Sequence, residues 1–226
     1  YIRGNQGNHS DDPIISLSKD ANDNPVYTIT RESTTTEVTV DYANSQTKVT
    51  TGASTNTYNG IPDGTSNEGV IIYTNDDIKS LSGTVAKTSQ VTVSAERDII
   101  ITNHIQYQEY TPSPLSAEGY TNLLGILSWG GDVRIGTSAP NNINIHGVVM
   151  APHGIFSVDN YQFGAPRGTA TLLGGAITDF YGPFGTFSGQ NPVSGYGRNF
   201  VYDARMLHGS APPYFPYLSN FTSFDD

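Results

Sequence analysis

Residues 69–85 read GVIIYTNDDIKSLSGTV, which is two short apolar runs joined by a polar corner. The same arrangement returns in QVTVSAERDIIITNHI (90–105) and again in LGILSWGGDVRIGTS (124–138). Short apolar runs bounded by polar corners are typical of buried β-strands. Three copies of one pattern indicate a repeating unit rather than a set of unrelated hairpins.

The spacing of the second runs supports a repeat. Ile78 and Ile99 are 21 residues apart, Ile99 and Val133 are 34 apart, and Val133 and Ile155 are 22 apart. The long interval contains a polar stretch with two prolines, residues 106–119, which we expect to be an insertion loop. The unit that contains Ile155 is the fourth, and a fifth, looser unit ends in GPFGTF (182–187). The first runs of the later units recur every 24 residues, at Leu124, Val148 and Leu172.

A repeat of 21 to 24 residues with short strands predicts a right-handed parallel β-solenoid of about five coils over residues 69–188. Residues 25–60 alternate apolar and polar positions, which predicts a small antiparallel meander that caps one end. The aromatic segment 189–226 is the predicted C-terminal cap. Residues 1–24 contain a short IISL and are expected to form an N-terminal arm. A two-sheet β-sandwich is the alternative architecture.

The composition limits the function classes. Eleven Lys and Arg face 21 Asp and Glu, so the net charge is −10, and such a chain repels nucleic acid and anionic membranes. The absence of cysteine excludes disulfides and thiolate metal sites. No apolar run approaches the roughly 20 residues of a membrane span. Tyr and Thr richness with little Lys favours an exported, extracellular protein, and a start at Tyr1 favours a processed or excised chain.

The corner before the second run holds an aspartate in three units, Asp77, Asp98 and Asp132. In stacked coils these carboxylates would lie about 5 Å apart, with a repulsion of about 1 kcal/mol per pair in water. They could be turn residues that accept hydrogen bonds from backbone amides. Alternatively, Asp76, Asp77, Asp98 and Asp132 could bind calcium, which prefers oxygen ligands.

The sequence predicts no catalytic residues. The segments NDD, RIG and PHG invite comparison with pectin-cleaving hydrolases. Those enzymes have an Arg-Ile-Lys motif after their histidine motif, whereas here Arg134 precedes His153 and its segment RIG contains no lysine. His146 and His153 lack an evident third metal ligand. No Gly-x-Ser-x-Gly motif indicates a hydrolytic triad. We therefore expect a protein that is not an enzyme and has no cofactor apart from calcium.

The last third of the chain is rich in aromatic residues, with Arg167, Arg198 and Arg205 nearby. Aromatic rings can stack on sugars or bases, or can pack to close the last coil. Both interpretations remain open. The residues concerned are Tyr161, Phe163, Phe180, Tyr181, Phe184, Phe187, Tyr196, Phe200, Tyr202, Tyr214, Phe215 and Tyr217.

From about Gly69 to Pro216 the order of these segments resembles an uncharacterised bacterial β-solenoid family. The most specific part is the closing Gly-Tyr-Gly (195–197), followed by Tyr-Asp-Ala-Arg (202–205) and Pro-Pro-Tyr-Phe-Pro (212–216). Members of that family typically follow a type IV pilin-like N-terminus, and a related solenoid occurs in a competence-associated minor pilin. The resemblance implies display on or beside pili, without catalytic residues.

These observations predict a non-enzymatic structural or adhesive component of a bacterial cell surface. Its expected partners are further copies of itself or other surface and pilus subunits. The arm over residues 1–24 could add a strand to a neighbouring copy and so build a filament. A β-solenoid that binds or cleaves polysaccharide is the alternative, and a DNA-binding pilus accessory is the third, which the negative charge disfavours.

Overall fold

The computed structural model describes residues 11–61, 69–109 and 121–216, which form an all-β protein, the class to which the predicted β-solenoid belongs. The N-terminal strands precede the first repeat unit. They are β1 (Ile14–Lys19), β2 (Pro25–Arg31), β3 (Thr34–Asp41), β4 (Gln46–Thr51) and β5 (Ser54–Asn59).

The repeat units and the C-terminal region supply the other ten strands of the described residues. These are β6 (Val70–Thr74), β7 (Ile78–Val85), β8 (Gln90–Ala95), β9 (Ile99–Tyr107), β10 (Leu123–Ser128), β11 (Val133–Ile135), β12 (Asn144–Val158), β13 (Pro166–Tyr181), β14 (Gly185–Ser188) and β15 (Asn191–Tyr202). A 3-10 helix, η2 (Ala204–His208), follows. Within the described ranges, no helix has the length and apolarity needed to cross a membrane.

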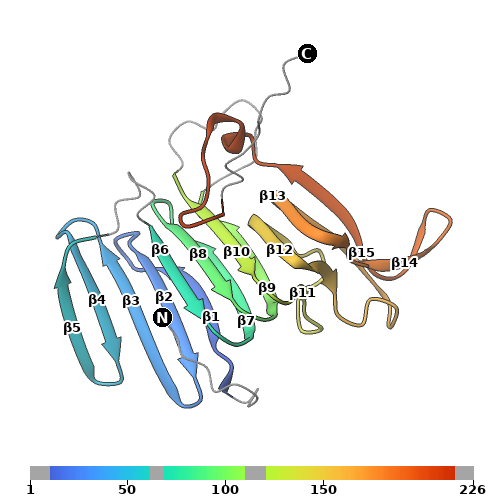
Figure 1. Cartoon of the computed structure of the whole chain (residues 1–226). Helices are drawn as coiled ribbons and strands as arrows, with labels where there is room; N and C mark the ends of the chain where they lie inside the picture. Colours follow the sequence, from blue (N-terminus) through green and yellow to red (C-terminus); the bar gives the residue numbers. More distant parts are fainter. Residues whose placement is uncertain (1–10, 62–68, 110–120, 217–226) are drawn as a thin grey trace.

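All strands belong to one large, mostly parallel sheet (Figure 1). Its main path runs β14-β15-β13-β12-β11-β9-β7-β1-β2-β3-β4-β5. A second parallel ladder, β6-β8-β10-β12, runs beside the first. In Figure 1 the path extends from β5 on the left to β14 and β15 on the right. The described chain is thus a column of strands with two ends.

Successive repeat units pair in parallel, and the second apolar run of one unit lies beside the second apolar run of the next. Ile78 pairs with Ile99 and Ile99 pairs with Val133, so the predicted alignment of these three units is confirmed. The first runs form their own ladder, in which Val91 lies between Val70 and Leu124. The sheet is built this way because one repeated pattern places the same apolar positions over each other in every unit.

The later units pair in a different register from the predicted one. Val133 pairs with Phe156 instead of Ile155, and Val148 pairs with Gly175, 27 residues on, instead of Leu172. The longer interval is taken up by the loop between β12 and β13, where Asn160 and Gly164 have positive φ angles of 53° and 81°. A loop can absorb extra residues at small cost, so the hydrophobic spacing alone did not reveal them.

The segment IISL has a defined place in the column, which the sequence did not indicate. Strand β1 pairs antiparallel with β2 and parallel with β7, and Ile15 and Leu17 are buried. Gly83 makes this approach possible, because a Cβ atom there would lie 2.0 Å from the Leu17 carbonyl oxygen. Residues 14–19 therefore cover the chain's own first repeat unit. Residues 1–10 of the predicted arm lie outside the described residues.

Strands β2 to β5 form the predicted antiparallel meander, and turn chemistry fixes its register. Asp41 ends β3 and its carboxylate accepts hydrogen bonds from the Asn44 amide at 3.1 Å and from the Lys48 ammonium at 2.7 Å. Ser45 and Gly52 in the two following turns have positive φ angles of 52° and 59°. Such turns bring successive strands side by side.

The core fills the space between the two ladders. It is made of aliphatic side chains from every repeat unit, together with Tyr27 from the meander and Tyr196 from β15. β-Branched and leucine side chains dominate because they pack well on a pleated surface. The largest fully buried aliphatic residues include Ile78, Leu81, Ile99, Ile101, Ile105, Leu124, Ile126 and Ile135.

The stack continues past the boundary expected at residue 188, because β15 pairs in parallel with β13. The predicted insertion loop begins after Tyr107, where β9 ends, and residues 110–120 lie outside the described residues.

Candidate functional site

The corner aspartates hydrogen-bond to the next unit of the stack. The Asp77 carboxylate accepts the backbone N–H of Asp98 at 2.8 Å, and Asp98 accepts that of Asp132 at 2.8 Å. Asp132 in turn accepts the N–H of Ile155 at 2.9 Å. Each carboxylate therefore accepts a backbone N–H from the neighbouring unit, just before β9 or β11 or, for Asp132, within β12. This is the turn role that the sequence allowed, except that the amide belongs to another unit.

Arg134 compensates part of the negative charge along this ladder. Its guanidinium donates to Asp98 at 2.8 Å and to Asp159 at 2.9 Å. The two carboxylates raise the pKa of Arg134 further, against the effect of its own partial burial. The positive charge of Arg134 therefore reduces the repulsion at Asp98, one of the three stacked aspartates.

The structure separates the four predicted calcium ligands. Asp76 and Asp77 lie together with Asp12, and one carboxylate oxygen from each falls within 4.8 Å of the others. Asp98 and Asp132 lie farther along the ladder, outside this cluster, and their carboxylates accept hydrogen bonds from backbone amides. Asp12 was missed, because it lies before β1 and only the pairing of β1 with β7 brings it to this corner.

The chemistry of the three-aspartate cluster fits a cation only in part. Calcium takes six to eight oxygen ligands, so three carboxylates would need added carbonyl or water oxygens. Asp76 is 2% exposed and forms an ion pair of 3.5 Å with Arg97, which already supplies a positive charge. Asp76 also accepts the N–H of Asp77 at 3.1 Å. The cluster could hold a hard divalent cation, in competition with Arg97.

The two candidate histidines do not converge. His153 is exposed, whereas His146 is buried and its Nδ1 accepts the backbone N–H of Tyr107 at 3.1 Å. The pKa of His146 is lowered to about 4, mainly by burial; the Asp203 carboxylate opposes this change and the Arg205 charge adds to it. His146 is thus a neutral side chain of the interior and not half of a metal site.

A buried ion pair holds the C-terminal segment against the column. Arg205 donates to Asp203 at 2.6 Å and to the Asn122 carbonyl at 2.8 Å, and its guanidinium lies 4.8 Å from the ring centroid of Tyr107. Asp203 and Arg205 are 0% and 4% exposed. A buried pair of this kind persists only when its hydrogen bonds are satisfied. Arg205 therefore anchors the segment.

The residues after this pair lie along the side of the column. Phe215 packs against Leu127 and Val148, and the Thr92 hydroxyl donates to the Pro213 carbonyl. Gly125 leaves room for the Phe215 ring, since a Cβ atom there would lie 2.7 Å from it. The described part of the predicted C-terminal cap thus covers β8 and β10, while β15 forms the end of the stack.

The predicted aromatic cluster divides into buried and exposed members. Phe184, Tyr196 and Phe215 are buried, which matches closure of the core. Tyr161 is half-buried and Tyr217 lies outside the described residues. The exposed members are Phe163, Phe180, Tyr181, Phe187, Phe200, Tyr202 and Tyr214.

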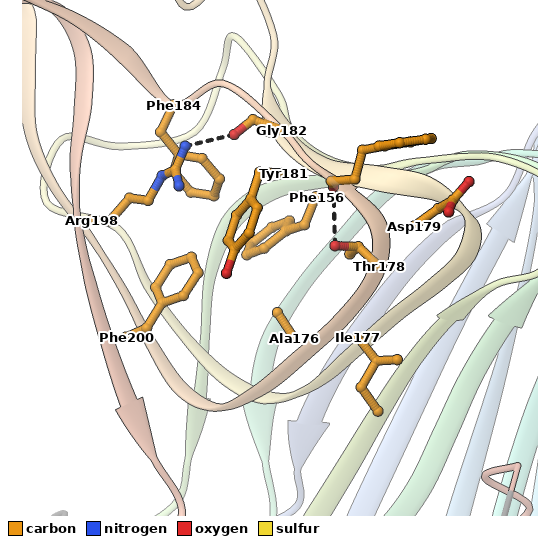
Figure 2. Close-up of a pocket in the computed structure, with 11 residues that line it drawn as sticks. Phe156, Ala176, Ile177, Thr178, Asp179, Tyr181, Gly182, Phe184, Arg198 and Phe200 are labelled. Carbon is orange, nitrogen blue, oxygen red and sulfur yellow. Dashed lines mark hydrogen bonds between the residues drawn. The ribbon is translucent and has the colours of Figure 1, made fainter. Parts of the chain in front are cut away.

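An aromatic groove of about 380 Å³ lies at the last repeat unit, between the second half of β13 and the second half of β15 (Figure 2). The rings of Phe156 and Phe200 stack with centroids 6.1 Å apart, and Phe184 meets both edge to face. Arg198 lies 4.8 Å from the Phe184 ring centroid and donates to the Gly182 carbonyl at 2.7 Å. The groove combines a rigid aromatic wall with one fixed cation.

A second groove, of about 320 Å³, follows the loop between β12 and β13. Its lining is more polar and includes Asn141, Asp159, Asn160 and Arg167, with the exposed ring of Phe163. Arg167 is held in place because it donates to the Thr137 carbonyl at 3.3 Å and lies 4.5 Å from the Tyr196 ring centroid. Amides, a carboxylate and a ring are groups that bind sugar hydroxyls and sugar faces.

Comparison of the chain with protein-family models, with curated proteins and with solved structures found no match. The resemblance to a pilus-associated solenoid family therefore stays a prediction.

Proposed function

We propose that this chain is a non-enzymatic structural or adhesive component on the surface of a bacterium, on or beside pili. In this proposal it acts as a short rigid column that other subunits contact at its end. The proposal includes a right-handed parallel β-solenoid of about five coils, because crossovers between parallel strands are right-handed almost without exception. It also includes membership of the family that the closing segments resemble.

One observation carries the proposal: exposed large hydrophobic side chains gather in the last unit of the stack. Fourteen such residues are exposed among the described residues, and eight of them lie between positions 177 and 202. Contiguous apolar surface of this kind marks an interaction site in soluble proteins. The eight are Ile177, Phe180, Tyr181, Phe187, Val193, Phe200, Val201 and Tyr202.

Surface labelling tests the proposal. Antibody and gold labelling of intact cells of the producing bacterium should detect the protein without lysis, and labelling should fall when Tyr181 and Phe200 are both replaced by Ser. Thermal melting checks that the double variant is folded, because Tyr181 is exposed but Phe200 also packs against Phe156 and Phe184. Replacing the exposed Trp129, far from the last unit in sequence, is the matched control. Labelling that requires lysis would contradict the proposal, and so would an undiminished signal from the double variant.

Saccharide binding is the second candidate, and the groove along the loop between β12 and β13 favours it. A glycan array read with the labelled protein tests this function directly. Binding that is lost in Phe163→Ala would support it, because Phe163 is the exposed ring of this groove. Release of sugar from polysaccharide would move the protein into the enzyme class instead.

A further inference from the structure

We propose that the partner at the last unit is a second copy of this chain, docked head to tail, with the free edge of β5 paired to the free edge of β15. This inference rests on the proposed structural role and adds the identity of the partner and the two strands that meet. It replaces the N-terminal arm as the connecting element, because β1 already pairs within its own chain.

The edge of β15 is open over its second half. On one side, residues 197–202 pair with β13. On the other side, β14 pairs only with residues 191–195. In the described part of the chain, no strand therefore covers the outer edge from Gly197 to Tyr202. An uncovered edge presents a row of backbone donors and acceptors that another strand can use.

The edge of β5 is open at the opposite end of the sheet. Strand β5 pairs with β4 alone among the described strands, and all six of its residues are exposed. Its sequence is STNTYN, without a charge or a proline. Natural edge strands usually carry lysine, proline or a bulge that prevents pairing with another chain. Strand β5 contains neither lysine nor proline, so its edge can pair with a strand of another chain.

The two edges match in length and in side-chain character. Six residues of β5 face six residues of β15, from Gly197 to Tyr202. Tyr58 on β5 is 56% exposed, while Phe200 and Tyr202 on β15 are 44% and 56% exposed. A strand added to β15 places alternate side chains beside these rings, and aromatic pairs across strands are stabilising. Phe200 also lines the aromatic groove of Figure 2, which offers room for a further ring.

Charge at these two edges does not oppose the contact. The chain carries a net charge of −10, so two copies repel each other at long range. Strand β5 has no charged residue, and Arg198 is the only charged residue between Gly197 and Tyr202. Association through these strands should therefore strengthen as salt screens the general repulsion. An interface made of ion pairs would weaken instead.

A contact between two different edges does not close on itself. After β5 of one copy pairs with β15 of the next, each added copy again presents one free β5 and one free β15. Heterologous contacts of this kind produce open filaments unless the rotation between copies closes a ring. The expected product is a linear assembly that grows with concentration.

Sedimentation velocity of the full chain, from about 5 to about 200 µM, tests the inference. The variants are Tyr58→Lys and Phe200→Lys, and Trp129→Lys is the control, because Trp129 is 39% exposed and lies on neither edge. Thermal melting checks that each variant is folded. The wild type and the control should grow beyond dimers, and more so at about 0.5 M salt. Each edge variant should bind at least tenfold more weakly.

Mixing the two edge variants gives the sharpest result. Tyr58→Lys keeps an intact β15 edge and Phe200→Lys keeps an intact β5 edge, so an equimolar mixture should form a heterodimer and stop there. A wild type that stays monomeric overturns the inference, as does a Tyr58→Lys variant that assembles like the wild type. A mixture without heterodimers also overturns it. Monomeric protein that still labels the cell surface would refute this contact and leave the proposed function standing.

Discussion

Acidification from pH 7 to pH 4 should destabilise the folded chain through His146. The side chain is 8% exposed, and its Nδ1 already accepts the backbone N–H of Tyr107 at 3.1 Å. A proton on Nδ1 would break this hydrogen bond and place a charge in the interior beside Arg205. Burial is the largest cause that lowers the pKa of His146 from 6.5 to about 4; Asp203 opposes the shift and Arg205 adds to it.

The sign and size of the effect follow from proton linkage. Above pH 6.5 the histidine is neutral in both states, and its full contribution to stability is present. Between pH 6.5 and about 4 the unfolded chain binds a proton that the folded chain excludes, so the free energy of unfolding falls as the pH falls. At about 1.4 kcal/mol for each tenfold change in proton affinity, the total loss is about 3 kcal/mol.

Urea denaturation followed by circular dichroism, repeated between pH 7 and pH 4, measures this loss. His146→Gln should be less stable at pH 7 and should lose most of the pH dependence in this range. His153→Gln is the matched control, since His153 is exposed, and it should retain the wild-type slope. Asp41, whose pKa is lowered to about 2 mainly by its hydrogen bond with Lys48, affects stability only below about pH 4. An equal slope in wild type and His146→Gln would refute the reasoning.

Four further predictions concern the ladder, the anchor, the close backbone contacts and the acidic cluster. Asp98→Ala removes a backbone hydrogen bond and an ion pair between units, and urea denaturation should show a loss of about 2 kcal/mol. Arg205→Ala removes the guanidinium that forms an ion pair with the buried Asp203 carboxylate and should cost about 3 to 5 kcal/mol, with faster proteolysis of the C-terminal segment; unchanged proteolysis would show that the ion pair is not the anchor. Gly174→Ala should cost about 2 kcal/mol or more, because φ is +148° and a Cβ atom would lie 2.0 Å from a carbonyl oxygen, whereas Gly175→Ala has open space and should be nearly neutral in the same assay. Millimolar calcium should raise the melting temperature if the cluster around Asp76 binds it, and Asp76→Asn should abolish the increase; an unchanged melting temperature would leave these aspartates as corner residues.

The repeat was readable because each unit carries the same local pattern. Apolar runs, a corner aspartate and a nearly constant spacing predicted that Ile78, Ile99 and Val133 would stack, and the pairing confirms it. The prediction succeeded where the intervals between units contained one recognisable insertion. It failed in the later units, by one residue between β11 and β12 and by three between β12 and β13, where the extra residues form a turn whose length no periodicity records.

The corner aspartates show how far local reasoning reaches at the candidate site. The sequence placed Asp77 and Asp98 at corners and allowed them to bond backbone amides. It did not identify which amides, because the donors are 21 and 34 residues away along the chain. Asp12 gave no sequence signal for the acidic cluster. Gly83, isolated within an apolar strand, was the available sign that another backbone approaches there.

The sequence by itself determined the all-β class, the parallel stacking of the first three units and the negative charge, because these depend on composition and on period. Only the tertiary structure decided where β1 and the segment around Phe215 lie. Strand β1 enters beside Gly83 and Phe215 packs over Gly125, so each terminal segment is positioned by a gap that a distant glycine leaves. Contacts between residues far apart in the chain depend on shape in three dimensions, and no local pattern encodes that shape. Among the described residues, the same placement leaves β5 and the second half of β15 each with one edge that no strand covers.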